Sequence, residues 1–176
     1  MAVKPPGYAG LVQLESALRS AVLTTNTSDT PVDADSAPGY RVYGASGVMD
    51  NGTGSLSAKE SGTITGATNA SPIVITSANH KLTNGVRVVV SGVLGNTAAN
   101  GTFVVANVTS NTFELQGSSG NGTYTSGGTW HTAGLYDFNY TPAAANGFVA
   151  GQNYVVLVTA TIGGINMAAV FAFTVT

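Results

Sequence analysis

The sequence predicts an all-β protein, and three observations support that prediction. The chain of 176 residues contains 23 glycines, and Ser, Thr and Asn cluster between short runs of β-branched residues. Those runs recur about every ten residues, which is typical of all-β domains. Pairs such as Asn84–Gly85 and Asn100–Gly101 supply the positive φ that tight hairpin turns need.

The N-terminal segment is the exception. Apolar residues recur there at helical spacing: Leu11, Leu14, Leu18 and Val22. Residues 1–20 are therefore expected to form a short helix or an arm that docks on a partner subunit. The anchors of such an arm would be Tyr8, Leu11, Leu14 and Leu18. The alternative is a simple extension that lies on its own domain.

Strand-like pieces follow the N-terminal segment. The strands expected there are Ala21–Thr25, Tyr40–Tyr43 and Gly54–Ala58. Between the first two, Ser28–Gly39 holds two prolines and three aspartates, a composition that favours a loop.

The C-terminal end has the clearest strand signal. Tyr154–Ile162 and Asn166–Val175 are long β runs joined by Gly163-Gly164, which is typical of a tight hairpin. A lone hairpin is not stable in water. We therefore expect it to pack on the earlier strands, so that residues 21–62 and 131–176 form one β-sandwich.

Residues 63–130 differ from the rest of the chain, because their strand-like runs are shorter and their turns are more closely spaced. This pattern predicts an inserted small β-barrel or meander. Its expected core is Ile73, Ile75, Val88, Val90, Phe103, Val105, Phe113 and Leu115. The flanks 59–62 and 132–134 are expected to lie side by side, because a domain inserted at a loop tip needs adjacent ends.

Charge is scarce. The chain has six basic and eight acidic residues, a net charge of −2 and no cysteine, and none of the charged residues follows Asp137. The basic residues are too few and too scattered for a nucleic-acid partner, and no apolar run reaches the ~18–20 residues that span a bilayer. The missing cysteines exclude disulfides and thiolate metal sites. A chain so poor in charge suits a subunit packed in an assembly.

Few residues suggest chemistry, and none is assigned a catalytic, metal or cofactor role. His80 and His131 have no ligand partner at metal-site spacing, so we expect turn or packing roles. The loop aspartates could bind calcium, but loop capping is the simpler interpretation of Asp29, Asp33 and Asp35. Rings that could stack on a sugar are Tyr124, Trp130 and Tyr136, although Trp130 is also expected to close the inserted barrel.

Two resemblances add to these observations. Residues 64–130 resemble a module that recurs in phage virion proteins and is distantly similar to a small β-barrel domain of ubiquitin-activating enzymes. The residues that carry this resemblance are Ile64–Thr76, His80–Gly85, Val90–Phe103, Asn111–Leu115 and Gly120–Trp130. The outer parts resemble immunoglobulin-like domains of tailed-phage structural proteins, through Pro31–Asp35, Tyr40–Tyr43, Gly134–Tyr136 and Gly147–Tyr154.

The resemblances imply a non-enzymatic virion protein, assembled in the host cytoplasm. The first hypothesis is a capsid decoration or cement protein that binds the major capsid protein or other virion subunits and forms a homo-oligomer within the particle. The second is a tail, fibre or adsorption component whose outer lobe touches a host glycan. No cofactor, nucleic acid or membrane is expected in either case.

Overall fold

The computed structural model describes residues 1–4 and 8–176, and it describes residues 8–11 by their backbone alone. The regular elements of the described chain are β-strands and two short 3-10 turns, η1 (Thr97–Ala99) and η2 (Ala144–Asn146). The prediction of an all-β protein is confirmed. The chain divides into two compact units. The first unit is 1–57 with 134–176, and the second unit is 58–133.

One sheet of the first unit has four strands in the order β1-β3-β14-β6. Their bounds are β1 (Ala2–Lys4), β3 (Leu18–Thr25), β14 (Leu135–Tyr140) and β6 (Ser57–Ala58). Strand β3 pairs antiparallel with both β1 and β14, and the register places Val22 opposite Tyr136. The short strand β1 therefore adds an edge to the sheet.

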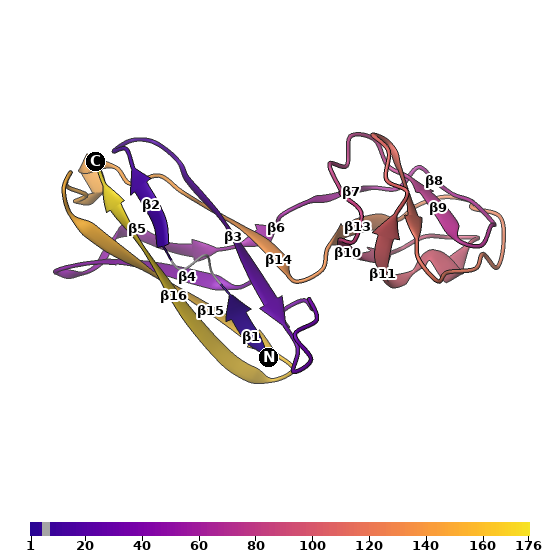
Figure 1. Ribbon diagram of the computed structural model, residues 1–176, viewed down its shortest axis with the longest axis horizontal. Coiled ribbons are helices and arrows are strands. Elements are labelled where there is room, and N and C mark those ends of the chain that lie inside the picture. Colours follow the sequence, from indigo (N-terminus) through magenta and orange to yellow (C-terminus); the bar gives the residue numbers. More distant parts are fainter. Residues whose placement is uncertain (5–7) are drawn as a thin grey trace. The chain divides into compact units, whose positions relative to one another are not determined.

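The other sheet has five strands in the order β2-β16-β15-β4-β5. Their bounds are β2 (Tyr8–Val12), β16 (Ile165–Val175), β15 (Asn153–Ile162), β4 (Gly39–Gly44) and β5 (Gly47–Ser55). Strand β2 runs parallel to β16, whereas the other pairs are antiparallel. The hairpin turn at Gly163 and Gly164 has φ values of 56° and 77°, the conformation that glycine adopts without strain. In Figure 1 this hairpin is the long yellow pair, with β1 beside its turn.

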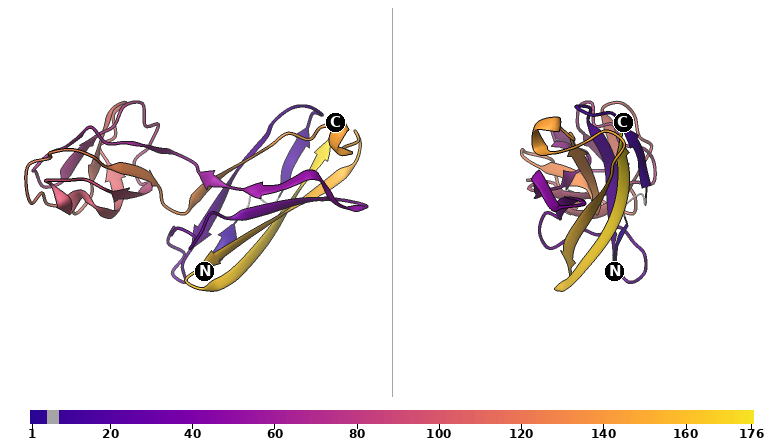
Figure 2. Two further views of the ribbon diagram at one scale, coloured as in Figure 1. Left: turned by 180° about the vertical axis from the view of Figure 1, so that it is seen from behind. Right: turned by 90° about the vertical axis from the view of Figure 1, so that its left-hand side faces the viewer.

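The two sheets pack face to face as an immunoglobulin-like sandwich, in which β1, β3, β14 and β6 form one layer and β4, β15 and β16 belong to the other (Figure 2). A tyrosine corner accompanies this strand order. The hydroxyl of Tyr154, near the start of β15, accepts the Val149 N–H at 2.8 Å. The predicted sandwich is therefore present, without the disulfide of antibody domains.

Alternating residues of both sheets build the core between them. Phe138, Phe171 and Phe173 are all at most 2% exposed, and the ring of Phe138 meets that of Phe171 edge-on at 5.3 Å. Aromatic pairs of this geometry add to the free energy of apolar burial.

The second unit is a seven-stranded sheet in the order β7-β13-β10-β11-β12-β9-β8. Its strands are β7 (Ser61–Thr63), β8 (Gly66–Ala67), β9 (Ile73–Thr76), β10 (Arg87–Ser91), β11 (Gly101–Ala106), β12 (Thr112–Leu115) and β13 (Thr129–Thr132). The Ile64 N–H donates to Gly128 O, and the Thr65 N–H donates to Thr76 O. One chain segment therefore joins both ends of the sheet. The closed barrel stays a prediction, although seven of its eight expected core residues are at most 2% exposed.

The prediction of a helix near the N-terminus is wrong. Residues 8–12 and 18–25 are strands, and Glu15 between them has a φ of 63°, which a helix does not allow. The Leu14 N–H donates to Thr176 O, so the chain end holds this segment. The spacing misled because residues four apart, such as Leu18 and Val22, share one face of a strand as well as one face of a helix. The N-terminal segment thus lies on its own domain.

Candidate interaction surface

The outward side of β4, β15, β16 and the start of β5 has an apolar centre, flanked by the polar residues Asn153, Thr161, Asn166 and Thr174, and we call this centre the outer face. It is formed by the residues that alternate with the buried ones: Val48, Gly39, Arg41, Tyr43, Val155, Leu157, Thr159, Ala168, Val170 and Ala172. Val48, Val155 and Val170 are 48%, 41% and 57% exposed. Exposed apolar side chains that gather on one surface mark interaction sites.

Cross-strand register brings these side chains together. Val155 lies opposite Tyr43 on one side and Ala172 on the other, and Leu157 lies opposite Arg41 and Val170. Directly opposite residues in an antiparallel pair have Cβ atoms about 4.5–5.5 Å apart. The apolar side chains therefore form a contiguous patch.

Two hollows lie where β4 begins beside β15, and the first reaches residues of both sides of the sheet, among them the core residues Ala160 and Met167. One, of about 440 Å³, is lined by Ser36, Ala37, Gly39, Thr159, Ala160, Thr161, Asn166, Met167 and Ala168. The other, of about 380 Å³, is lined by Gly39, Tyr40, Arg41, Thr53, Gly54, Leu157 and Thr159. Because Gly39 and Thr159 line both, the hollows adjoin each other.

Arg41 is the one charged residue of β4, β15 and β16. Its side chain is exposed, and its guanidinium forms no hydrogen bond or ion pair with the described residues. The neighbouring edge strand β5 contributes one acidic residue, Asp50, which is exposed and is not paired with Arg41. The outer face therefore combines apolar area with one free guanidinium, and Asp50 lies at its edge, two residues from Val48.

The predicted arm residues lie elsewhere. The backbone of Tyr8 pairs with Ala172 of β16, and that of Leu11 pairs with Thr174; their side chains lie outside the described part of the structure. Leu14 packs against the core of the first unit, and Leu18 is 4% exposed within it. In this conformation Leu14 and Leu18 stabilise their own domain and are not offered to a neighbour.

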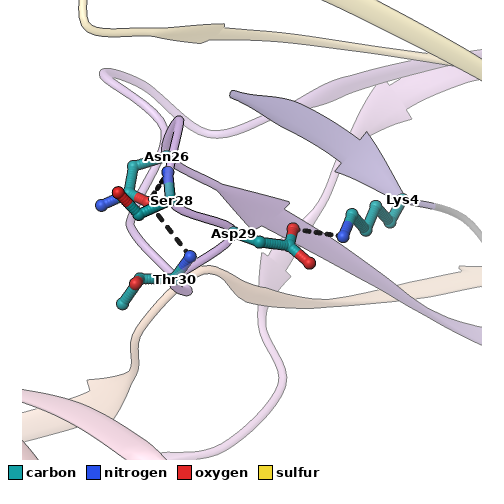
Figure 3. Close-up of polar contacts among 5 residues, drawn as sticks. All are labelled: Lys4, Asn26, Ser28, Asp29 and Thr30. Carbon is teal, nitrogen blue, oxygen red and sulfur yellow. Dashed lines mark hydrogen bonds and ion pairs between the residues drawn. The ribbon is translucent and has the colours of Figure 1, made fainter.

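The first loop aspartate anchors strand β1. Asp29 forms an ion pair with Lys4 (Figure 3). The turn beside it is shaped by Asn26, whose side-chain oxygen accepts the N–H groups of Ser28 and Thr30 at 2.9 and 3.0 Å. The hydrogen bond from Lys4 lowers the pKa of Asp29 below 3.8, because it favours the charged carboxylate.

The other two aspartates cap backbone groups. Asp33 accepts the Gly134 N–H at 2.8 Å. The two oxygens of Asp35 accept the N–H groups of Gly163 and Gly164 at 2.9 and 2.8 Å. Within the described chain no group of three His, Asp or Glu side chains could hold a metal ion. Loop capping accounts for the contacts of Asp33 and Asp35.

His80 has a structural role in the second unit. Its Nδ1 accepts the Leu82 N–H at 3.1 Å, and its Nε2 lies 3.2 Å from Thr112 O. The ring also meets those of Phe113 and Trp130 edge-on. Because both ring nitrogens face backbone groups, the imidazole serves as the turn residue that the sequence predicts.

The rings proposed for sugar stacking are engaged inside the protein. Trp130 is 1% exposed and Tyr136 is 7% exposed. The hydroxyl of Tyr124 donates to the carbonyl oxygens of Ile64 and Gly127, at 3.1 and 3.0 Å. Neither Trp130 nor Tyr136 presents a face to a sugar, so that interpretation is wrong for these two residues.

The second unit carries a polar hollow of its own, of about 520 Å³. It is lined by Ser71, Pro72, Ala106, Asn107, Glu114, Gln116, Gly117, Ser118 and Ser119. The Asn107 amide donates to one oxygen of Glu114 at 2.8 Å. These hydroxyl, amide and carboxylate groups are the kinds that hydrogen-bond to neutral polar ligands.

Comparisons with known proteins do not identify a family. No family model matches the chain, and no curated protein matches it. Among solved structures the chain is similar to the phage phi92 endosialidase, with 15% sequence identity over 98% of this chain and a TM-score of 0.32. The chain spans 28% of that protein's length, and a likeness at this TM-score supports no functional conclusion. In the described residues we find no helix with the length and apolar character needed to cross a membrane.

Proposed function

We propose that the protein is a structural component of a phage particle, and that it decorates the capsid by binding the major capsid protein. The observation that carries this proposal is the outer face, an apolar patch of a β-sandwich in which β4, β15 and β16 hold a single charged residue. Cores of protein interfaces are likewise depleted of charge. An isolated soluble domain usually avoids such a patch, since it promotes association.

The sequence resemblances support the choice of partner. Both the inserted module and the immunoglobulin-like parts resemble components of phage virions, through motifs in 64–130 and in 31–43 and 134–154. A decoration protein needs a rigid scaffold and a binding surface but no reactive groups. The sandwich supplies both, because its binding surface lies on hydrogen-bonded strands.

Copy number in purified particles tests the proposal. Quantitative mass spectrometry of intact particles, with the major capsid protein as internal standard, should find hundreds of copies of this chain per particle. Absence of the chain from particles would overturn the virion proposal as a whole. A count near a dozen or below would overturn the capsid location and favour the tail.

A tail or fibre component that contacts a host glycan is the second candidate. The observation that favours it is the hollow in the second unit, where Asn107, Glu114 and Gln116 offer hydrogen-bonding groups. Chemical-shift changes on addition of host surface glycan test this role. Shifts confined to the hollow would support it, and an unchanged spectrum at millimolar glycan would overturn it.

A further inference from the structure

We infer that the outer face binds a partner protein that presents a carboxylate to Arg41 and apolar side chains to the two adjoining hollows. The inference rests on the proposed function and adds the chemistry of the partner. It follows from three properties of the face: its hollows, its single charge and its area.

The hollows are built by small residues. Gly39 lies between them, opposite Thr159, and a Cβ added there would meet the Thr159 hydroxyl oxygen at 3.4 Å. Ala168 faces Thr159 from the other side. Larger side chains would fill these positions, so the concave shape is a property of the sequence.

The walls of the hollows define what fits. Thr53, Thr159 and Asn166 line them with hydroxyl and amide groups, whereas Leu157 and Ala168 are apolar. Both are open depressions, of about 440 and 380 Å³, which leaves room for side chains of a partner. A partner can therefore insert side chains here without moving a strand.

The charge of Arg41 selects among partners. Its guanidinium is always protonated and donates in a fork that matches a carboxylate. Covering the face without pairing this charge would cost the desolvation of a cation. A protein that buries the outer face must therefore supply a carboxylate opposite Arg41.

A second copy of this chain meets that requirement poorly. In a twofold contact the same patch is present on both sides, so each outer face brings another Arg41. The five strands of the sheet contain one acidic residue, Asp50, on the edge strand β5. The charge pattern therefore favours a different protein as the occupant.

The area is adequate for a specific contact. Four strands at about 4.8 Å spacing, with about ten residues at about 3.3 Å each, give a face of about 600 Å². Standard interfaces bury about 800 Å² per partner. One contact of this size is modest, and the loops around the face can extend it.

The test uses the full chain and phage particles assembled without it, obtained by deleting its gene. Wild-type protein and Arg41→Glu are added to these particles, and binding is measured by co-sedimentation. We expect Arg41→Glu to weaken binding at least tenfold. Arg19→Glu is the matched control, because Arg19 is an exposed arginine on β3 of the other sheet and should leave binding unchanged. Equal binding of wild type and Arg41→Glu would overturn the inference while leaving the proposed function intact.

Two further measurements complete the test. Ala168→Phe fills one hollow without changing the charge, and it should also weaken binding. It replaces Arg41→Glu as the test variant if circular dichroism shows that Arg41→Glu is poorly folded. A photo-crosslinking residue at position 159 should then trap a partner peptide that contains Asp or Glu. Replacing this acidic residue of the partner with Arg should restore the binding of Arg41→Glu. A crosslink to a second copy of this chain, or to a glycan, would overturn the inference. Wild-type protein absent from natural particles would instead overturn the proposed function.

Discussion

The indole N–H of Trp130 donates to the hydroxyl of Ser77 at 2.8 Å, and both residues are 1% exposed. The pair links β13 to the segment after β9, and the rings of Phe113 and His80 pack around it. A buried indole N–H without an acceptor is costly. The hydroxyl at position 77 thus allows the chain's one tryptophan to lie in the core of the second unit.

Ser77→Ala should lower the free energy of unfolding of the second unit by about 1–3 kcal/mol, because it leaves the Trp130 N–H unsatisfied. Tryptophan fluorescence during urea unfolding measures this directly, since Trp130 is the sole tryptophan. Ser110→Ala is the control, because Ser110 is exposed, and it should change the midpoint little. A midpoint for Ser77→Ala equal to that of wild type would contradict the assigned role.

The tyrosine corner gives a second prediction. Tyr154→Phe removes the acceptor of the Val149 N–H but keeps the ring among Phe148 and Phe173. We expect the free energy of unfolding of the first unit to fall by about 1 kcal/mol, the usual net contribution of one hydrogen bond. Calorimetry measures this change in the free energy of unfolding. Tyr43→Phe on the outer face is the control, and an equal loss in both variants would contradict the specific role of Tyr154.

Local signals were sufficient for the C-terminal hairpin and for much of the second core. Gly163 and Gly164 are adjacent in sequence, and the alternation on each side of them fixes the faces of β15 and β16. The same holds for Ile73, Ile75 and Phe113, which are buried as predicted. Hairpins are predictable because their partners are neighbours in the chain.

Contacts between distant residues were not predictable in the same way. Strand β2 pairs in parallel with β16, which lies at the opposite end of the chain. No local sequence pattern indicates that pairing. The Asp35 carboxylate accepts hydrogen bonds from the N–H groups of Gly163 and Gly164, which are distant in sequence. Acidic residues in a loop indicate capping, but the capped groups depend on how the sandwich closes.

The outer face did leave a signal in the sequence. Residues 154–158 are apolar at every position. In a strand with one solvent-exposed face, apolar residues alternate with polar ones. An uninterrupted apolar run on a surface sheet indicates that both faces are covered in the working state. The sequence also predicts a contact at Tyr8, Leu11, Leu14 and Leu18, because these apolar residues recur at helical spacing.

Burial of Leu18 predicts what truncation does. Leu18→Ala should lower the free energy of unfolding of the first unit by about 2–4 kcal/mol, as for other large-to-small core changes. Deleting residues 1–17 should destabilise that unit further, since β1 and β2 are paired to β3 and β16. Calorimetry compares both with Arg19→Ala, an exposed neighbour on β3. A truncated protein with the wild-type transition would show instead that the segment is a dispensable arm.

The ion pair of Lys4 and Asp29 predicts a loss of stability in acid. Because the pKa of Asp29 is lowered in the folded state, its contribution is present above the unfolded value of about 3.8 and is lost as pH falls through the folded value. Asp29→Asn should therefore flatten the fall in melting temperature of the first unit below pH 4. The effect should be small and should shrink in high salt, since both side chains are exposed. A steeper acid transition in Asp29→Asn would contradict this assignment.

Tyr140 predicts a loss of stability at alkaline pH, the opposite pH direction from Asp29. Burial and the neighbouring Tyr40 raise its pKa from 10.0 to about 12, and its hydroxyl has no hydrogen-bond partner among the described residues. The folded state therefore favours the neutral phenol, so this contribution is complete below about pH 10 and is lost as pH rises through about 12. Tyr140→Phe removes an unsatisfied buried oxygen and should raise the free energy of unfolding at neutral pH by about 1 kcal/mol. It should also delay alkaline unfolding of the first unit, whereas Tyr43→Phe should not. A Tyr140→Phe variant that is less stable than wild type at neutral pH would show that the hydroxyl has a partner after all.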